Sequence, residues 1–346
     1  LYLPTFFHPD PTVKRQSGFL IPSISNSNTF GSILSVPYYH VISNNKDLTF
    51  SPRFYSNNDL LLQSEYRQVN KSSKHTVDTS LYTKSKLGIG LDKSKGHFFS
   101  NSNYFIDLEN FDETSLEINL QQASKNKFLK NYNVTSPLAE NNTTLNSYFN
   151  FNANREDLSI KSSIEIFENL NTERSSDRYE FVYPQFEINK NLNTFESFDG
   201  DVILSSNFYQ KKYNTNVYEG ALINDLRFNS NTNFLNSGFL NNFKILLKNV
   251  NTNTANSNKY KDSHNTQVLS AMQYQTSYPL AKSTNTSNNS LTPIASVMFS
   301  PNKTKNMKND DKRINTDNIF SLERIADVET VEGGLSFTLG SNYKKT

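Results

Sequence analysis

Residues 14–25 read KRQSGFLIPSIS, and two related stretches follow, SVPYY at 35–39 and LTFSPRFY at 48–55. Each stretch is typical of a short strand of apolar and aromatic residues, yet each has a proline inside it, where a paired strand needs a backbone donor. Pro22 and Pro37 lie fifteen positions apart on strands that we expect to be neighbours. The pattern therefore predicts a sheet edge that pairs weakly.

The segments RQSGFLIPSI, VPYY and SPRFY, in this order and spacing, resemble the start of the C-terminal barrel of the LptD family. LptD is the outer-membrane translocon for lipopolysaccharide, also called organic solvent tolerance protein. A second segment, LERIA at 322–326 followed by Gly333, Gly334 and Leu335, resembles the LDRIA…G segment of that family. The resemblance runs in the same order from about Leu1 to Leu339 and is most specific at its two ends.

The composition favours strands over spanning helices. Of the 346 residues 35% are hydrophobic, the mean hydropathy is −0.64, and no run of 18 apolar residues exists, which excludes membrane-spanning helices. A transmembrane barrel tolerates such a composition, because every second residue faces the lumen. Aromatic residues make up 13% and include no Trp, which suits strands and interface girdles but also a secreted β-sandwich.

Polar and apolar residues alternate in segments of eight to twelve residues separated by Asn, Ser, Asp and Lys clusters, which predicts hairpin-connected strands. We predict an all-β fold, a large antiparallel transmembrane β-barrel with roughly 16 to 18 strands visible and the ring not complete in this chain. A charge facing lipid near the midplane costs about 2–4 kcal/mol. The charged side chains are therefore assigned to the lumen: Arg53, Glu65, Arg67 and Glu117. Four polar stretches are predicted as loops, at 169–178, 249–264, 283–289 and 302–318.

The resemblance implies two parts. Residues 1–11, with three prolines, are expected to be an extended connector from an N-terminal periplasmic domain, and residues 12–346 form the outer-membrane barrel. The start without methionine and the end without an aromatic residue lead us to expect a processed or partial sequence, with further C-terminal strands outside it.

No motif for catalysis is present. The five histidines lack metal-ligand spacing, and the sequence has no cysteine, P-loop or GxSxG motif, so we expect no enzyme, cofactor or metal site. LptD barrels are tied to their periplasmic domain by disulfides, and the missing cysteines depart from that pattern. The net charge of +2 gives no reason to expect nucleic acid as a partner.

The resemblance implies a Gram-negative outer-membrane protein that transports lipopolysaccharide into the outer leaflet. Pro22 and Pro37 would form its lateral gate, near the seam where the first strand meets the last, although prolines also mark strand starts and bulges. Lys14 and Arg15 are candidates for binding lipid headgroups or for anchoring the strand at the interface, and Tyr38 and Tyr39 are candidate girdle aromatics. The partners implied are lipopolysaccharide, membrane lipids, a lipoprotein plug inside the barrel, and a periplasmic bridge protein that docks on the N-terminal domain.

Two other interpretations stay open. Another outer-membrane barrel, a porin or a TonB-dependent receptor, would share the alternation without a proline-weakened seam. A secreted all-β adhesin or glycan-binding sandwich would bury both apolar faces and dissolve without detergent.

Overall fold

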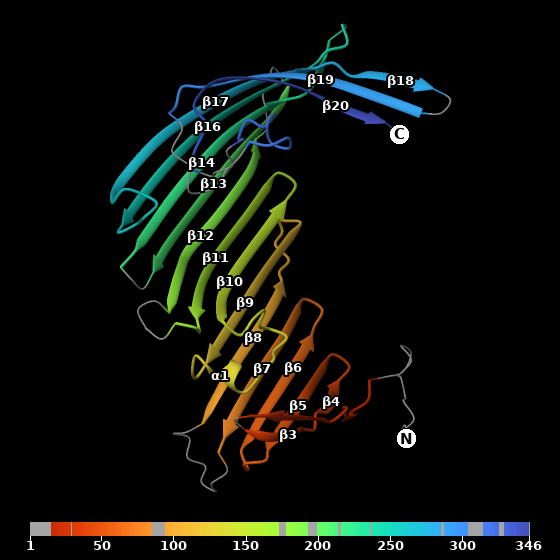
Figure 1. Ribbon diagram of the computed structural model, residues 1–346, viewed down its shortest axis with the longest axis vertical. Helices are drawn as coiled ribbons and strands as arrows, with labels where there is room; N and C mark the ends of the chain where they lie inside the picture. The colour runs from red at the N-terminus through yellow and green to blue at the C-terminus, as the bar shows by residue number, and fades with distance from the viewer. Residues whose placement is uncertain are drawn as a thin grey trace. The chain divides into compact units, whose positions relative to one another are not determined.

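The protein is almost entirely antiparallel β-sheet, which confirms the predicted all-β class (Figure 1). The computed structural model describes these residues: 15–28, 30–84, 94–172, 178–192, 199–213, 216–235, 237–284, 287–303, 314–324 and 329–345. The chain divides into two compact units, and each is described by itself. Unit 1 comprises residues 1–108, 113–151 and 165–181, and unit 2 comprises residues 109–112, 152–164 and 182–346.

The first half of the element order contains eleven strands and one short helix. They are β1 (Gly18–Phe19), β2 (Ser23–Ser27), β3 (Gly31–Ser35), β4 (Tyr38–Ser43), β5 (Lys46–Tyr55), β6 (Leu60–Val69), β7 (Ser73–Thr83), β8 (Lys95–Phe105), β9 (Glu113–Ala123), α1 (Phe128–Asn131), β10 (Thr144–Arg155) and β11 (Leu158–Asn169).

Nine further strands complete the order. They are β12 (Tyr179–Leu192), β13 (Gly200–Tyr213), β14 (Tyr218–Ser230), β15 (Asn233–Phe234), β16 (Leu240–Ala255), β17 (Ser263–Ser277), β18 (Leu280–Thr284), β19 (Ser287–Ser300) and β20 (Gly334–Lys345).

In unit 1 the strands follow one another as an antiparallel meander from β4 to β9. The register places apolar residues on one face, where Pro52 pairs with Leu62, and polar residues on the other, where Asp47 pairs with Arg67. The apolar face includes Leu48, Phe50, Pro52, Phe54, Leu60, Leu62, Leu81, Phe98, Leu116, Ile118 and Leu120. The polar face carries Asp47, Thr49, Ser51, Arg53, Gln63, Glu65, Arg67, Asp78, Ser80, His97, Asn101, Glu117, Asn119 and Gln121. The predicted period-two alternation is thus confirmed strand by strand.

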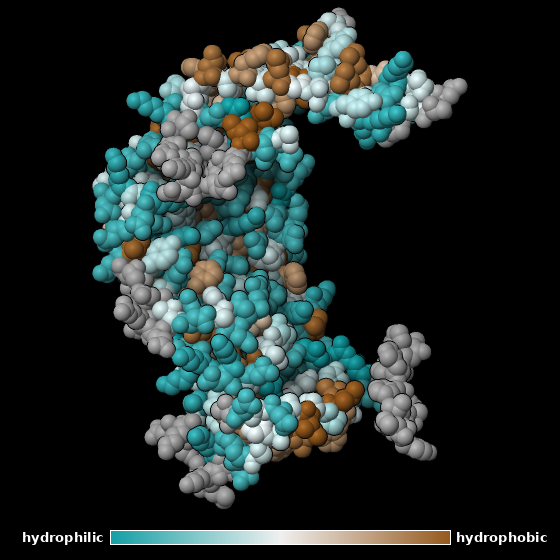
Figure 2. Space-filling view, in the orientation of Figure 1, coloured by the Kyte–Doolittle hydropathy of each residue, from teal (hydrophilic) through white to brown (hydrophobic). Residues whose placement is uncertain are grey.

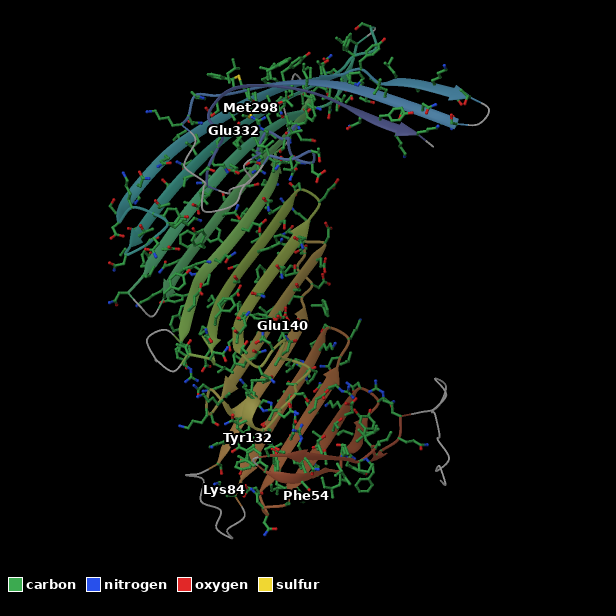
Figure 3. All side chains as sticks on the ribbon, in the orientation of Figure 1. Phe54, Lys84, Tyr132, Glu140, Met298 and Glu332 are labelled. Atoms are coloured by element: carbon green, nitrogen blue, oxygen red, sulfur yellow. The ribbon has the colours of Figure 1, made fainter. Side chains whose placement is uncertain are left out.

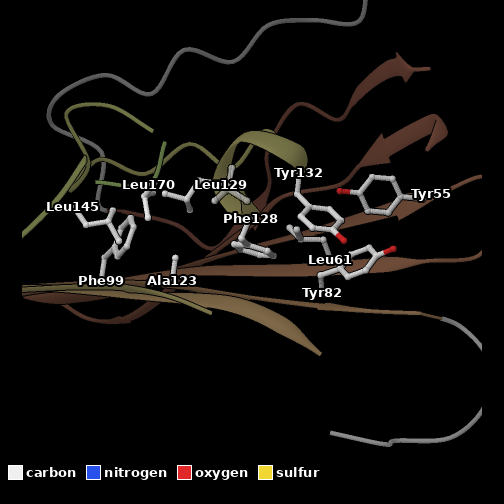
Figure 4. Close-up of a cluster of buried hydrophobic side chains, with 11 residues drawn as sticks. Tyr55, Leu61, Tyr82, Phe99, Ala123, Phe128, Leu129, Tyr132, Leu145 and Leu170 are labelled. Carbon is white, nitrogen blue, oxygen red and sulfur yellow. The ribbon is translucent and has the colours of Figure 1, made fainter. Parts of the chain in front are cut away.

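Residues 124–141, which we call the first covering segment, lie over the polar face of unit 1 (Figure 4). The helix α1 within it has no side-chain cap and buries Phe128 and Leu129. These two side chains and Tyr132 pack against a set of sheet residues: Leu61, Tyr82, Phe99 and Ala123. Burial of one apolar side chain contributes about 1.5–3 kcal/mol, so packing rather than helix propensity holds this short helix. Tyr132 and Glu140, labelled in Figure 3, mark this segment.

In unit 2 the long strands β13, β14, β16, β17, β19 and β20 pair in this order, all antiparallel. One face carries exposed apolar side chains: Leu226, Leu247, Met272, Tyr274, Val297, Phe299, Leu335, Phe337 and Leu339. In Figure 2 hydrophobic residues of this unit gather at the upper end of the view, over the C-terminal strands. The opposite, polar face is covered by residues 314–324 and 329–333, which we call the second covering segment, through a cluster of Leu246, Ala271, Met298, Leu322 and Val331.

Two details of the prediction need correction. The described residues contain 20 strands rather than 16 to 18, because Pro22 and Pro37 each interrupt a strand and because β15 and β18 are short additions beside β16 and β19. Residues 249–255 are not a loop but the end of β16. Val250, Thr252 and Thr254 are buried there and alternate with asparagines, and the high asparagine content hides this alternation in the sequence.

The predicted loop at 283–289 is also largely strand, and here too the many polar residues hide the alternation in the sequence. Ser283 and Thr284 belong to β18, and Ser287 onward belongs to β19, with Ser283 paired to Asn288. The predicted loops at 169–178 and 302–318 lie partly outside the described residues, as does all of the connector 1–11. In the part of the chain that is described, no helix has the length and hydrophobicity needed to cross a bilayer.

Candidate functional site

Three prolines lie at nearly one level on successive strands of unit 1. Pro22 lies in the break between β1 and β2, Pro37 in the break between β3 and β4, and Pro52 inside β5. The strands pair normally on either side, with Phe19 opposite Tyr38 before the break and Ser23 opposite Ser35 after it. We call Pro22, Pro37 and Pro52 the proline row.

Pro37 and Pro52 each leave a single hydrogen bond where two are normal. The amide of Leu20 donates to the carbonyl of Pro37 at 2.9 Å, and the amide of Val36 donates to the carbonyl of Pro52 at 3.2 Å. Residues that face each other in this way in an antiparallel ladder exchange two bonds, but proline has no N–H to return one. Two adjacent seams therefore each lack a bond at almost the same height.

Pro52 is absent from the gate residues predicted from the sequence. It follows Pro37 by the same fifteen residues that separate Pro37 from Pro22, and this repeated spacing is the signal that could have found it. On its other side Pro52 is opposite Leu62, in a fully formed ladder with β6. The hydrogen bond that Pro52 cannot make is therefore on the side of β3 and β4, and the pairing of β5 with β6 is not weakened.

The N-terminal strand is also apolar and open on its outer surface. Phe19, Ile21 and Ile24 are 76%, 77% and 78% exposed. Phe19 makes an edge-on ring contact with Tyr38, with ring centroids 5.0 Å apart. Large apolar side chains this exposed on a sheet edge indicate a surface that meets lipid or another apolar partner.

The other candidate residues from the sequence do not share one face of the sheet. Tyr38 is opposite Phe50 on the apolar face, whereas Tyr39 is opposite Thr49 on the polar face, because consecutive strand residues point to opposite sides. Arg15 donates to the carboxylate of Asp47 at 2.9 Å and so ties the start of the described chain to β5. Lys14 lies outside the described residues.

All four charged residues assigned to the lumen lie on the polar face of unit 1. Glu65 and Arg67 are neighbours on β6, with Arg67 also 2.7 Å from Asp47. Glu117 on β9 accepts hydrogen bonds from Asn101 and from the hydroxyl of Tyr148, each at 2.8 Å. The sheet therefore brings these charges to one side, as the alternation predicts.

Arg53 links the first covering segment to the proline row. Its guanidinium donates to the carbonyls of Tyr132 and Asn133 at 3.2 and 3.0 Å and to Gln63 at 3.1 Å. On its own strand Arg53 follows Pro52 and is opposite Ser35. A pocket of about 480 Å³, which we call the proline pocket, lies between these parts and is lined by Ser35, Pro37, Thr49, Ser51, Arg53, Gln63, Glu65, Thr135, Ser136 and Pro137.

A buried group of Ser80, His97 and Asp78 lies on the same face. The Ser80 hydroxyl is 2.6 Å from His97 Nδ1, and His97 Nε2 is 3.5 Å from Asp78. These residue types are those of a hydrolytic triad, but none of the three lines the proline pocket. Asp78 also accepts from Gln63, so the group joins neighbouring strands beneath the covering segment.

Unit 2 has its own network of charges on the polar face. Lys248 is fully buried and lies 2.8 Å from the carboxylate of Asp225, which Arg227 also contacts at 2.8 Å. Glu323, from the LERIA stretch, lies 3.0 Å from Arg227 and 3.8 Å from Lys248. Two cations and two anions thus hold this stretch to the sheet, and the neighbouring Arg324 is paired with Glu332.

A second contact holds the end of this covering segment. Glu329 accepts hydrogen bonds from Tyr209 at 3.0 Å and from Tyr260, and it pairs with Lys259 at 3.0 Å. Burial, followed by the hydrogen bonds to Glu329 and Tyr209, raises the pKa of Tyr260 above its usual range, because burial disfavours the phenolate. Tyr260 is therefore a neutral donor over the whole physiological range.

Comparison with known proteins gives partial but consistent matches. The chain is 26% identical to the LPS-assembly protein LptD of Legionella pneumophila (strain Lens) over 150 residues, which is 39% of this chain and 17% of that protein. It is 40% identical to LptD of Pseudomonas entomophila over 74 residues, 21% of this chain and 8% of that protein. It is 44% identical to LptD of Shewanella oneidensis over 69 residues, 19% and 9% of the two chains. The matched part is thus less than a fifth of each of these relatives.

Other comparisons add little. No family model matches the chain. A solved bacterial polysaccharide outer membrane secretin aligns over 91% of this chain and 89% of its own, at 8% identity and a TM-score of 0.29. That similarity is too low to support an argument.

The two-faced antiparallel sheet, together with these relatives, defines the chain as an outer-membrane protein of the β-barrel class. Within that class it is similar to the LPS-assembly protein LptD over the matched stretches.

Proposed function

We propose that this chain forms part of the wall of an outer-membrane barrel that transports lipopolysaccharide and inserts it into the outer leaflet. The barrel is a conduit rather than an enzyme, and the proline row is its lateral gate. The observation that carries the proposal is the pair of single bonds, Leu20 to Pro37 and Val36 to Pro52, at nearly one height on adjacent seams.

The energetics support a gate at this place. A backbone hydrogen bond contributes about 0.5–1.5 kcal/mol net in water, and in the bilayer no water replaces an unmade bond. A seam that already lacks bonds has fewer to lose when its strands separate. Separation there therefore costs less than separation along the fully paired ladder of β5 and β6.

The two faces suit an amphipathic cargo. The polar face would line the lumen and accommodate the glycan, because a charged side chain facing lipid costs about 2–4 kcal/mol near the midplane. The apolar face would contact membrane lipids, with Tyr38 near the interface, and the acyl chains would leave through the gate. Lys14 and Arg15, which precede the first strand in the sequence, would meet acidic headgroups. A plug lipoprotein and a periplasmic bridge protein are the proposed partners. The lumen residues in this arrangement are Arg53, Glu65, Arg67 and Glu117.

The gate is tested by restoring the missing donors. In the full-length protein, Pro22, Pro37 and Pro52 are replaced together by Ala, which returns N–H donors at positions 37 and 52 opposite Leu20 and Val36. We expect slower amide hydrogen exchange at Leu20 and Val36 and less lipopolysaccharide at the cell surface. The matched control is Pro293→Ala in β19, since Pro293 also lies inside a paired strand, opposite Ser341.

Two results decide the matter. Reduced delivery in the triple variant with normal delivery in the control supports the gate. Normal delivery in a triple variant that migrates as a folded barrel, with slowed exchange at Leu20 and Val36, would falsify it.

A further inference from the structure

A second pocket lies on the polar face of unit 1, beside the proline pocket. Its volume is about 490 Å³, and Pro137 is the residue that the two pockets share. We call it the amide pocket. The part of its lining that the argument uses consists of Asn101, Asn119, Gln121, Asn146, Tyr148 and Phe167.

Three adjacent strands supply the amide side chains of this pocket. Asn101 on β8 is directly opposite Asn119 on β9, and the Asn119 amide donates to the carbonyl of Asn146 on β10 at 2.7 Å. Gln121 donates to the carbonyl of Leu138 at 2.6 Å and accepts from the amide of Asn146 at 2.9 Å. These contacts to the backbone fix the side chains in place, so the pocket is formed before any ligand arrives.

The pocket retains unused hydrogen-bonding capacity. The side-chain oxygen of Asn146 is buried and has no hydrogen-bond partner among the described residues. A buried acceptor of this kind is normally satisfied, and a ligand hydroxyl would satisfy it. Primary amides offer both donors and acceptors, which suits a ligand that carries many hydroxyl groups.

The charge of the lining selects against anions. It contains the carboxylate of Glu140 and neither lysine nor arginine, and the carboxylate of Glu117 lies beside it, bonded to Asn101 and Tyr148. A phosphate would meet like charge without a compensating cation. The proline pocket differs, since Arg53 lines it.

We propose that the amide pocket binds uncharged sugar residues of a glycan. The amides bind the hydroxyl groups, and the rings of Tyr148 and Phe167 provide apolar surface for the C–H face of a sugar. The inference deepens the proposed function and rests on it for the source of the glycan, which is the transported lipopolysaccharide. The pocket would bind neutral sugars beside the proline pocket.

The test measures binding by the purified full-length protein in detergent. The probe is a neutral oligosaccharide prepared from the lipopolysaccharide core by removal of its lipid and phosphate groups, and calorimetric titration measures its affinity. Asn146→Ala removes the unpartnered oxygen while leaving the backbone bonds of residue 146, and we expect about a fivefold loss of affinity, as for one neutral hydrogen bond. Asn265→Ala, at an exposed asparagine of β17, is the control and should bind as the unchanged protein does.

Further measurements keep the result decisive. Tyr148→Phe tests the lining independently if Asn146→Ala does not fold, and it too should weaken binding. Unchanged affinity in a folded variant of either kind overturns the proposal. If the unchanged protein binds the phosphorylated oligosaccharide more tightly than the neutral one, the assignment to uncharged sugars is overturned.

The test of the amide pocket can succeed or fail independently of the test of the gate. If the proline variants leave lipopolysaccharide delivery unchanged while Asn146→Ala weakens binding, the gate proposal fails and the sugar site stands. If the proline variants block delivery while binding is unaffected by Asn146→Ala and Tyr148→Phe, the sugar site fails and the gate stands.

Discussion

At the scale of single residues, Lys248 occupies a tightly constrained position. Its ammonium group is fully buried on the polar face of unit 2, where Asp225 lies within 2.8 Å and Glu323 within 3.8 Å. A buried charge without partners is strongly unfavourable, so the side chain is compatible with this fold because the two carboxylates are present. No local pattern in the sequence indicates this pairing, because both partners lie far from Lys248 in the chain.

Replacing Lys248 by Met tests that dependence. The variant leaves the buried Asp225 with Arg227 as its cation, and we expect destabilisation of about 1–3 kcal/mol, less than for a charge left wholly unpaired. Urea unfolding of the protein in detergent, followed by tyrosine fluorescence, measures it. Lys244→Met, on the same strand and the same face, is the control and should have a smaller effect. Equal effects at the two positions would contradict the account.

At the scale of elements, the covering segments decide what each polar face presents. The first covering segment stays in place through apolar side chains such as Phe128, which pack on the sheet, and through the bonds from Arg53 and Gln63 to its carbonyls. The second stays in place through Leu322 and the charges around Glu323. Neither segment is an extended loop remote from the sheet.

Phe128→Ala is expected to loosen the first covering segment. Phe128 is 1% exposed, and truncation of a buried phenylalanine costs about 3–5 kcal/mol. Limited proteolysis between residues 124 and 141 should become faster while the strands stay protected. The control is Phe98→Ala on the apolar face of β8, where the side chain is 48% exposed. If Phe98→Ala were cleaved in this segment as fast as Phe128→Ala, the prediction would be contradicted.

The strands were predictable from the sequence, whereas the covering segments were not. The faces of β5, β6 and β9 follow from strict alternation, a local signal set by the geometry of a strand. Residues 249–255 were predicted wrongly, because polar asparagine and threonine occupy both faces there and hide the period. Pairs such as Arg53 with Tyr132, or Tyr260 with Glu329, depend on contacts between residues far apart in the chain, and no local pattern encodes them.

At the scale of the whole molecule, one regularity is common to both units: one face of each sheet is apolar and exposed, and the other is polar and covered. Leu120 in unit 1 and Leu247 in unit 2 are 50% and 46% exposed on the apolar side. A water-soluble protein would bury surfaces of this extent. The pattern suits a sheet with hydrocarbon on one side.

The orientation is tested with a charge on each face. Leu120→Arg places a cation on the apolar face and should destabilise the protein in lipid vesicles by up to about 2–4 kcal/mol, depending on depth. Asn103→Arg, on the polar face of the paired strand β8, should cost far less. Folding in vesicles, followed by heat-modifiable migration, compares the two. A larger cost for Asn103→Arg would reverse the assignment of the faces.

If the proline row is the gate that we propose, the equal spacing of Pro22, Pro37 and Pro52 makes the turn lengths between them part of it. The three imino acids line up because each hairpin brings the chain back to the same height. Inserting or deleting one residue in either connection would shift a proline along its strand and turn it to the opposite side. The prolines would then no longer lie at one height, and each missing hydrogen bond would be surrounded by intact strand pairing. The proposed gate therefore requires that loop length, which most proteins vary freely, stays fixed in these two hairpins.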